Sequence, residues 1–157
     1  MFVLLMEDEM AKLRVADDFA VTGGVTDYGI IFLGTDYVTT SSIFGVLLAE
    51  GIGLQFRGRN FKYEDGMPVS GTVTGYTAMG PSGRVAELSG FDIGISKFMK
   101  VASTTSLDDD SRLLEKIYSG NDDLAGSNLS DVLSGGKGND KIFGRGGGDE
   151  LYGGSGA

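Results

Sequence analysis

Aspartate recurs every nine residues toward the C-terminal end of this chain. The four positions are Asp122, Asp131, Asp140 and Asp149. An aliphatic residue follows each aspartate by two positions, at Leu124, Leu133, Ile142 and Leu151. Carboxylate oxygens are ligands for hard cations, and calcium in particular takes about 6–8 oxygen ligands. Because two residue classes keep the same period over four units, the segment is predicted to be a structural repeat that binds a cation.

Glycine is the second feature of each unit. It clusters ahead of the aspartates, where it permits the positive φ of a tight loop whose carbonyl groups converge. One aliphatic residue per unit indicates a very short strand with one inward side chain. Two units would form one turn of a flattened parallel solenoid, which stacks the Asp122 loop over the Asp140 loop and the Asp131 loop over the Asp149 loop. The candidate metal ligands are Gly120, Asp122, Asp131, Gly136, Gly138, Asp140, Gly147 and Asp149.

The stretch "GGKGNDKIF" at residues 135–143 fits the nonapeptide pattern G-G-x-G-x-D-x-U-x in full. Residues 118–157 therefore resemble the RTX (repeats-in-toxin, hemolysin-type) calcium-binding repeats. The resemblance implies a parallel β-roll that folds on binding Ca2+, in a protein that leaves a Gram-negative bacterium by type I secretion and acts outside the cell or at its surface. The sequence departs from the pattern at Arg145, which replaces a glycine, and at Leu129, where a positive φ would be strained.

The two ends of the chain carry further expectations. "GGSGA" at the C-terminal end matches the first five positions of another unit, so we expect a fragment that is truncated within the roll. More repeats and a secretion signal would lie beyond it. "MFVLLMEDEM" at the start lacks the basic region and the apolar length of a secretory leader, so it is interpreted as ordinary structure.

Composition excludes several classes of protein. The 157 residues carry a net charge of −9, which argues against nucleic acid or an anionic membrane surface as a partner. No histidine and no cysteine is present, which excludes the usual zinc sites and nucleophiles activated by histidine. No run approaches the roughly 20 apolar residues of a transmembrane segment. Oxygen ligands remain, and they suit calcium better than magnesium, which demands a tighter octahedron.

The remaining elements are predicted to be mainly β. Residues 1–105 are expected to form a β-rich (α+β) domain, with strands at "YGIIFLG", "LQFRGRNFKY" and "FDIGIS" and a hairpin around "GPSG". The segments "SSIFGVLLAEG" and "MEDEMAKLRVADDF" fit either a helix or a strand. A connecting helix is predicted over residues 106–118, with capping oxygens at Ser106 and a stop at Gly120. Residues 119–157 form the truncated repeat domain.

Three classes of function are considered for the N-terminal domain. A structural, surface-layer, adhesive or matrix module is the first hypothesis, with self-association or a cell-surface polysaccharide as its partner. No enzyme is evident, although carboxylates for a glycan-acting enzyme could come from Glu50, Glu64, Asp65, Glu87 or Asp92. A ligand carrier is the third possibility, because the "VSGTVTGYTA" and "ELSGFDI" strands resemble those of secreted haem carriers. Its candidate ligands would be Tyr28, Tyr37, Tyr63 and Tyr76.

Overall fold

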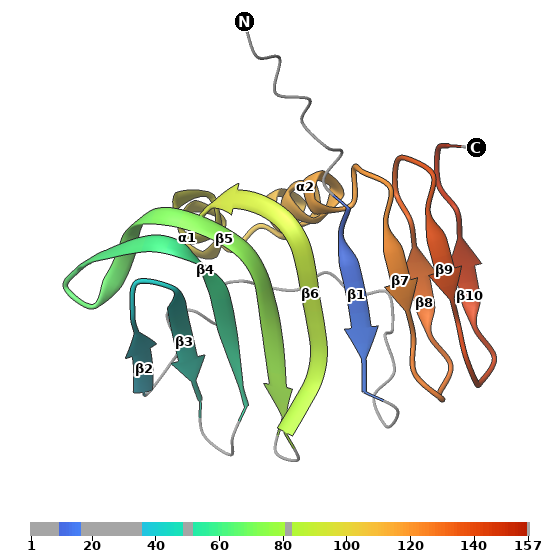
Figure 1. Ribbon diagram of the computed structural model, residues 1–157, viewed down its shortest axis with the longest axis horizontal. Coiled ribbons are helices and arrows are strands. Elements are labelled where there is room, and N and C mark those ends of the chain that lie inside the picture. Colours follow the sequence, from blue (N-terminus) through green and yellow to red (C-terminus); the bar gives the residue numbers. More distant parts are fainter. Residues whose placement is uncertain (1–9, 17–35, 49–51, 81–82, 157) are drawn as a thin grey trace, which may run out of the picture.

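The computed structural model describes residues 10–16, 36–48, 52–80 and 83–156. The predicted strand at "YGIIFLG", the segment at residues 1–9, Tyr28 and Glu50 lie outside these residues. Within them the protein is mainly β, with one large mixed sheet, one small sheet and two helices (Figure 1).

Eight strands form the large sheet. In spatial order they are β2 (Asp36–Thr39), β3 (Ile43–Leu47), β4 (Gly53–Glu64), β5 (Met67–Gly80), β6 (Gly83–Gly94), β1 (Lys12–Val15), β7 (Asp123–Ala125) and β9 (Lys141–Phe143). Neighbours from β2 to β6, and the pair β6–β1, are antiparallel. The pairs β1–β7 and β7–β9 are parallel. A second, two-stranded sheet pairs β8 (Val132–Ser134) with β10 (Glu150–Tyr152), also in parallel.

The segments "SSIFGVLLAEG" and "MEDEMAKLRVADDF", whose patterns fit either a helix or a strand, both contain strands. Residues 43–47 form β3, because Phe44 and Val46 point into the core while Leu47 is exposed. Residues 12–15 form β1, whose Val15 is buried. The predicted hairpin around "GPSG" is confirmed by the pairing of Gly80 with Gly83.

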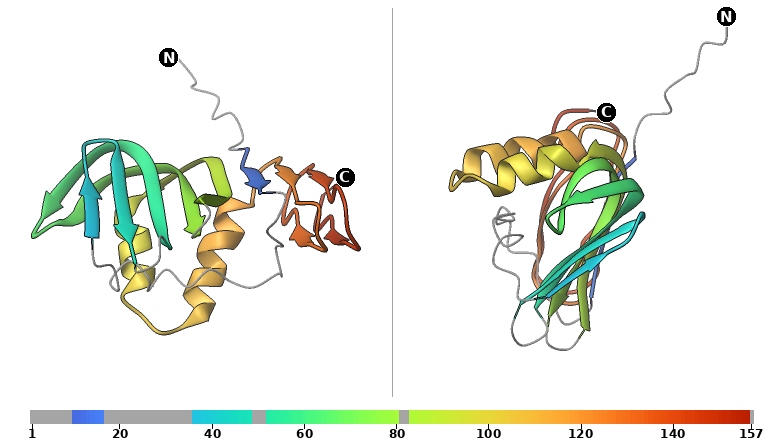
Figure 2. Two further views of the ribbon diagram at one scale, coloured as in Figure 1. Left: turned by 90° about the horizontal axis from the view of Figure 1, so that it is seen from below. Right: turned by 90° about the vertical axis from the view of Figure 1, so that its left-hand side faces the viewer.

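Two helices lie side by side on one face of the sheet (Figure 2). The predicted connecting helix is α2 (Leu107–Ile117), and the hydroxyl of Ser106 accepts the Asp108 N–H at its N-terminus. The other helix, α1 (Ile95–Ala102), was not predicted, and the strand expected at "FDIGIS" was wrong beyond Gly94. The helix forms because Ile95 and Phe98 both lie on its buried face. The Phe98 and Phe56 ring centroids are 5.3 Å apart, which fixes α1 against the sheet.

An apolar row crosses the sheet from the N-terminal strands to the repeats. Successive partners in the strand register are Phe44, Phe56, Tyr76, Leu88, Leu13, Leu124 and Ile142. The face of the sheet that contacts α1 is therefore the face that lies inside the repeats. The sequence suggested a domain boundary at residue 119. The large sheet includes strands from both sides of that boundary, because β1 pairs with β6 and with β7. The division into domains stays a prediction. No helix in the described part of the chain is long and apolar enough to cross a membrane.

Candidate metal centre

The loops before β7 and β9 stack on one another at an offset of eighteen residues. The Asp140 carboxylate accepts the Asp122 N–H through Oδ1 at 2.9 Å. The Asn121 side-chain oxygen accepts the Asn139 N–H at 2.7 Å. The spacing of nine predicted this stacking, because strands two units apart pair in parallel. It did not predict the contribution of Asn121.

Glycine is required where these loops approach each other. Gly136 and Gly138 have φ values of 83° and 117°, which L-residues rarely adopt. A Cβ at Gly138 would collide with the carbonyl oxygen of Gly120, and a Cβ at Gly136 would collide with that of Tyr118. Backbone carbonyl oxygens of one loop therefore lie directly against the next loop. Five of the predicted site residues lie in this stack, namely Gly120, Asp122, Gly136, Gly138 and Asp140.

Two carboxylate oxygens of this stack are buried without a partner. They are Oδ2 of Asp122 and Oδ2 of Asp140. Asp122 is 1% exposed, and its other oxygen, Oδ1, accepts the Ala11 N–H at 2.7 Å. Burial raises the pKa of Asp122 to about 6; the Ala11 hydrogen bond opposes the rise and the charge of Asp140 adds to it. A buried, unpaired carboxylate oxygen is costly, and a cation would remove that cost.

The other three predicted site residues lie in a second stack, between the loops before β8 and β10. The Asp149 carboxylate accepts the Asp131 N–H at 3.0 Å, which repeats the contact of the first stack. The Ser130 hydroxyl accepts the Gly148 N–H at 3.0 Å. Gly147 has a φ of 102°, and a Cβ there would collide with Leu129. Asp131, Asp149 and Gly147 are thus brought together, on the opposite side of the repeats.

Ser127 distinguishes the second stack from the first. Its N–H and its hydroxyl both donate to Oδ2 of Asp131, at 2.6 and 3.1 Å, so this carboxylate oxygen already has partners within the protein. The Ser127 hydroxyl in turn accepts the Leu129 N–H at 3.0 Å. Leu129 is not among the described residues with positive φ, so the loop avoids the strain expected there. Arg145 does take a positive φ, of 72°, at its glycine position.

Three further glycines match the repeat pattern but are not among the candidate metal ligands. A Cβ at Gly126, Gly135 or Gly144 would collide with the carboxylate of the aspartate five residues later in the same loop. Each carboxylate therefore folds back over the start of its own loop. The signal was present in the sequence, because all three precede an aspartate by the same interval.

The first stack fits a hard cation better than the second. It offers two carboxylate oxygens without partners, and the carbonyl oxygens of Tyr118 and Gly120 lie against the neighbouring loop. Carboxylate and carbonyl oxygens are the donors that calcium prefers. No group of three or more acidic side chains converges within the described ranges. Most ligands would therefore be backbone carbonyls.

Comparison with known proteins agrees with this geometry. Residues 125–157 match the family model of the RTX calcium-binding nonapeptide repeat (4 copies). The chain carries RTX-type repeats at its C-terminal end. No curated protein and no solved structure matches the chain. The RTX match covers residues 125–157 only. Strands β2 to β6, which we call the N-terminal sheet, are therefore interpreted from their own residues.

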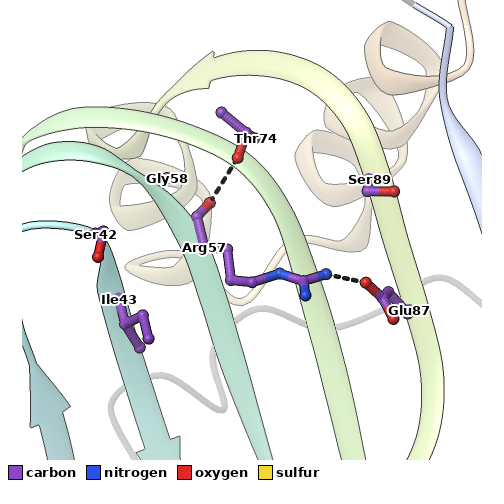
Figure 3. Close-up of a pocket in the computed structure, with 7 residues that line it drawn as sticks. All are labelled: Ser42, Ile43, Arg57, Gly58, Thr74, Glu87 and Ser89. Atoms are coloured by element: carbon purple, nitrogen blue, oxygen red, sulfur yellow. Dashed lines mark hydrogen bonds and ion pairs between the residues drawn. The ribbon is translucent and has the colours of Figure 1, made fainter.

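A shallow pocket lies on the face of the large sheet opposite the core (Figure 3). Its volume is about 560 Å³, and it is lined by Ser42, Ile43, Arg57, Gly58, Thr74, Glu87 and Ser89. The Arg57 guanidinium points at the Glu87 carboxylate and forms an ion pair with it. Glycoside hydrolysis uses two carboxyl groups on either side of the bond that breaks. Glu87 is the one carboxylate among the lining residues described here, and it is paired with an arginine.

The other candidate catalytic and ligand residues do not converge in the described structure. Asp92 pairs with Arg59, while Glu64 and Asp65 lie at the turn between β4 and β5. The Tyr63 hydroxyl donates to the carbonyls of Thr40 and Ile43. Tyr76 packs against Phe56 and Phe91 in the core, and Tyr37 stacks on Phe44. These contacts give the tyrosines structural roles.

Proposed function

We propose that this chain is a calcium-binding protein whose repeats, at residues 119–157, form a β-roll that orders when Ca2+ binds outside the cell. The observation that carries the proposal is that two buried carboxylate oxygens, Oδ2 of Asp122 and Oδ2 of Asp140, have no partner in two stacked loops whose contact also includes backbone carbonyls. A cation between these loops would satisfy both oxygens. Asp122, Asp140 and the carbonyls of Tyr118 and Gly120 would hold it.

The repeats have little else to stabilise them. Ordering glycine costs more backbone entropy than ordering any other residue. Each unit contributes one aliphatic side chain, and their burial declines along the repeats, from 1% exposed at Leu124 to 47% at Leu151. The stacked carboxylates also repel one another. The free energy of calcium binding would therefore become free energy of folding.

A structural or adhesive role at the cell surface or in the extracellular medium is the biological part of the proposal. RTX repeats typically occur in secreted proteins, and type I secretion would deliver the chain to millimolar calcium. Self-association or a matrix polysaccharide would be the partner. A catalytic role is disfavoured, because Glu87 and Asp92 are each engaged by an arginine.

Hydrogen exchange read by mass spectrometry tests the calcium switch on the whole chain. Calcium is expected to slow exchange in peptides from residues 119–156 relative to a chelator, whereas magnesium at equal concentration is not. Asp140→Asn removes one unpartnered oxygen and should raise the calcium concentration at half-protection at least tenfold. The matched control is Asp36→Asn, which removes an exposed carboxylate on β2, at the opposite edge of the large sheet from β9, and should leave the midpoint unchanged. Equal protection in calcium and in chelator would refute the switch.

A further inference from the structure

Strand β1 occupies the place of a repeat strand although its sequence is not a repeat. It lies between β6 and β7 (Figure 1) and pairs with β7 in parallel, as β9 does on the other side. The register is the same on both sides. Lys12 and Lys141 flank Asp123, while Leu13 and Ile142 flank Leu124. Leu13 therefore stands where a preceding unit would have its inward aliphatic residue.

The backbone contacts at the start of β1 also repeat those of the true units. The Ala11 N–H donates to Oδ1 of Asp122 at 2.7 Å, as the Asp122 N–H donates to Oδ1 of Asp140 at 2.9 Å. In the other direction, the Ala11 carbonyl accepts the Asp123 N–H at 2.9 Å, and the Asp122 carbonyl accepts the Lys141 N–H at 2.7 Å. Ala11 thus makes the two backbone contacts of a unit's aspartate, without its carboxylate.

Side-chain contacts hold β1 in this register. The Arg14 guanidinium lies 3.1 Å from the Asp123 carboxylate and donates to the Asp123 carbonyl at 2.9 Å. Lys12 and Lys141 lie on either side of Asp123 in the register, so opposite charges alternate across three parallel strands. On its other edge β1 pairs with β6 along its whole length.

We propose that residues 11–15 are a pseudo-repeat that caps the calcium-binding stack and transmits its ordering to the N-terminal sheet. The proposal rests on the calcium-dependent folding argued above. Ala11 is a positioning residue, because its N–H fixes one oxygen of Asp122 and leaves the other for the cation. Coupling of this kind is reciprocal. Calcium therefore stabilises β1 and β6, and the docked β1 raises the calcium affinity of the first stack.

Hydrogen exchange of the full chain tests the coupling without any substitution. Calcium should slow exchange in peptides covering residues 10–16 and 83–94, beyond its effect on residues 119–156. Protection confined to residues 119–156 would overturn the coupling and leave the calcium switch standing. Protection nowhere would overturn the calcium switch and the coupling with it.

Two substitutions probe the interface from the side of β1. Arg14→Asp places a carboxylate against Asp123 and should raise the calcium midpoint of residues 119–156 by about two- to five-fold, the range of exposed ion pairs. Lys62→Asp is the matched control, because it makes the same change of charge at an exposed position of β4, which is two strands away from β6. Ala11→Pro removes the N–H that Asp122 accepts and should raise the midpoint further. If Arg14→Asp and Lys62→Asp shift the midpoint equally, the capping role is wrong.

Discussion

At the scale of single residues, Asp122 and Asp140 each use one carboxylate oxygen for stacking and leave the other without a partner. Oδ1 of Asp122, Asp140 and Asp149 accepts a backbone N–H from a neighbouring turn, which sets the stacking. The other oxygen is without a partner in Asp122 and Asp140. In Asp131 the corresponding Oδ2 is bound by Ser127. The carboxylates were predictable from their period, whereas the role of Ala11 was not, because a backbone N–H leaves no mark in the sequence.

Arg145 gives the first prediction at this scale. Its φ of 72° costs an L-residue about 1–2 kcal/mol, which exceeds the entropy cost of glycine, about 0.5–1 kcal/mol. Arg145→Gly should therefore raise the free energy of unfolding by roughly 0.5–1 kcal/mol, measured by urea denaturation at saturating calcium. Lys137→Gly is the control, since Lys137 is also an exposed basic residue of a repeat loop but lacks positive φ. It should lower stability by about the same amount. Destabilisation by both variants would show that the backbone of Arg145 is not strained.

At the scale of elements, strand β1 connects the N-terminal sheet to the repeats. It is bonded to β6 on one edge and to β7 on the other, although about 110 residues separate it from β7 along the chain. Gly90 makes the docking possible, because a Cβ there would collide with the carbonyl of Met10. The N-terminal sheet and the repeats therefore share hydrogen bonds through one four-residue strand.

Sequence patterns captured the local elements and missed the long-range ones. The helix at α2 was predictable because Ser106 and the spacing of Leu113, Leu114 and Ile117 mark it locally. Helix α1 was missed because the apolar stretch around Ile95 continues that of β6, and burial against Phe56 decides its conformation. The pairing of β1 with β7 was missed because no local pattern specifies a partner so distant in the chain. The stacking of the repeats was predictable because its offset is twice their period.

Gly90 provides the prediction at the scale of elements. Gly90→Ala should destabilise the protein by more than Gly66→Ala, measured by urea denaturation. Both glycines have positive φ, 92° and 79°, and share a conformational cost of about 1–2 kcal/mol. Only at Gly90 would the added methyl group also collide with another segment, at the carbonyl of Met10, since nothing lies within 4 Å of a Cβ at Gly66. The additional loss of stability in Gly90→Ala, relative to Gly66→Ala, should be accompanied by faster hydrogen exchange in residues 10–16. Equal losses of stability would show that β1 can shift to accept a methyl group.

At the scale of the whole molecule, one sheet extends from β2 to β9, and one apolar row crosses it from β3 to β9. The net charge of −9 opposes compaction, and part of that charge lies in the stacked aspartates. A bound cation would neutralise repulsion at one end of a sheet whose hydrogen bonds continue to the other. The stability of the N-terminal aromatic core should therefore depend on calcium that binds at the far end.

Thermal unfolding followed by near-ultraviolet circular dichroism tests this dependence. The chain has no tryptophan. Tyr63, Tyr76 and Tyr118 lie in or against the N-terminal core, whereas Tyr152 of the repeats is 54% exposed, so the near-ultraviolet signal of packed tyrosines reports on that core. One site at a hundredfold excess over its Kd contributes about 2.7 kcal/mol. For a chain of this size that raises the Tm by roughly 5–10 °C if the two halves unfold together. We expect the near- and far-ultraviolet transitions to coincide in calcium, and the near-ultraviolet transition to fall by that amount in chelator. An unchanged near-ultraviolet Tm would mean that calcium binding to the repeats does not change the stability of the N-terminal core.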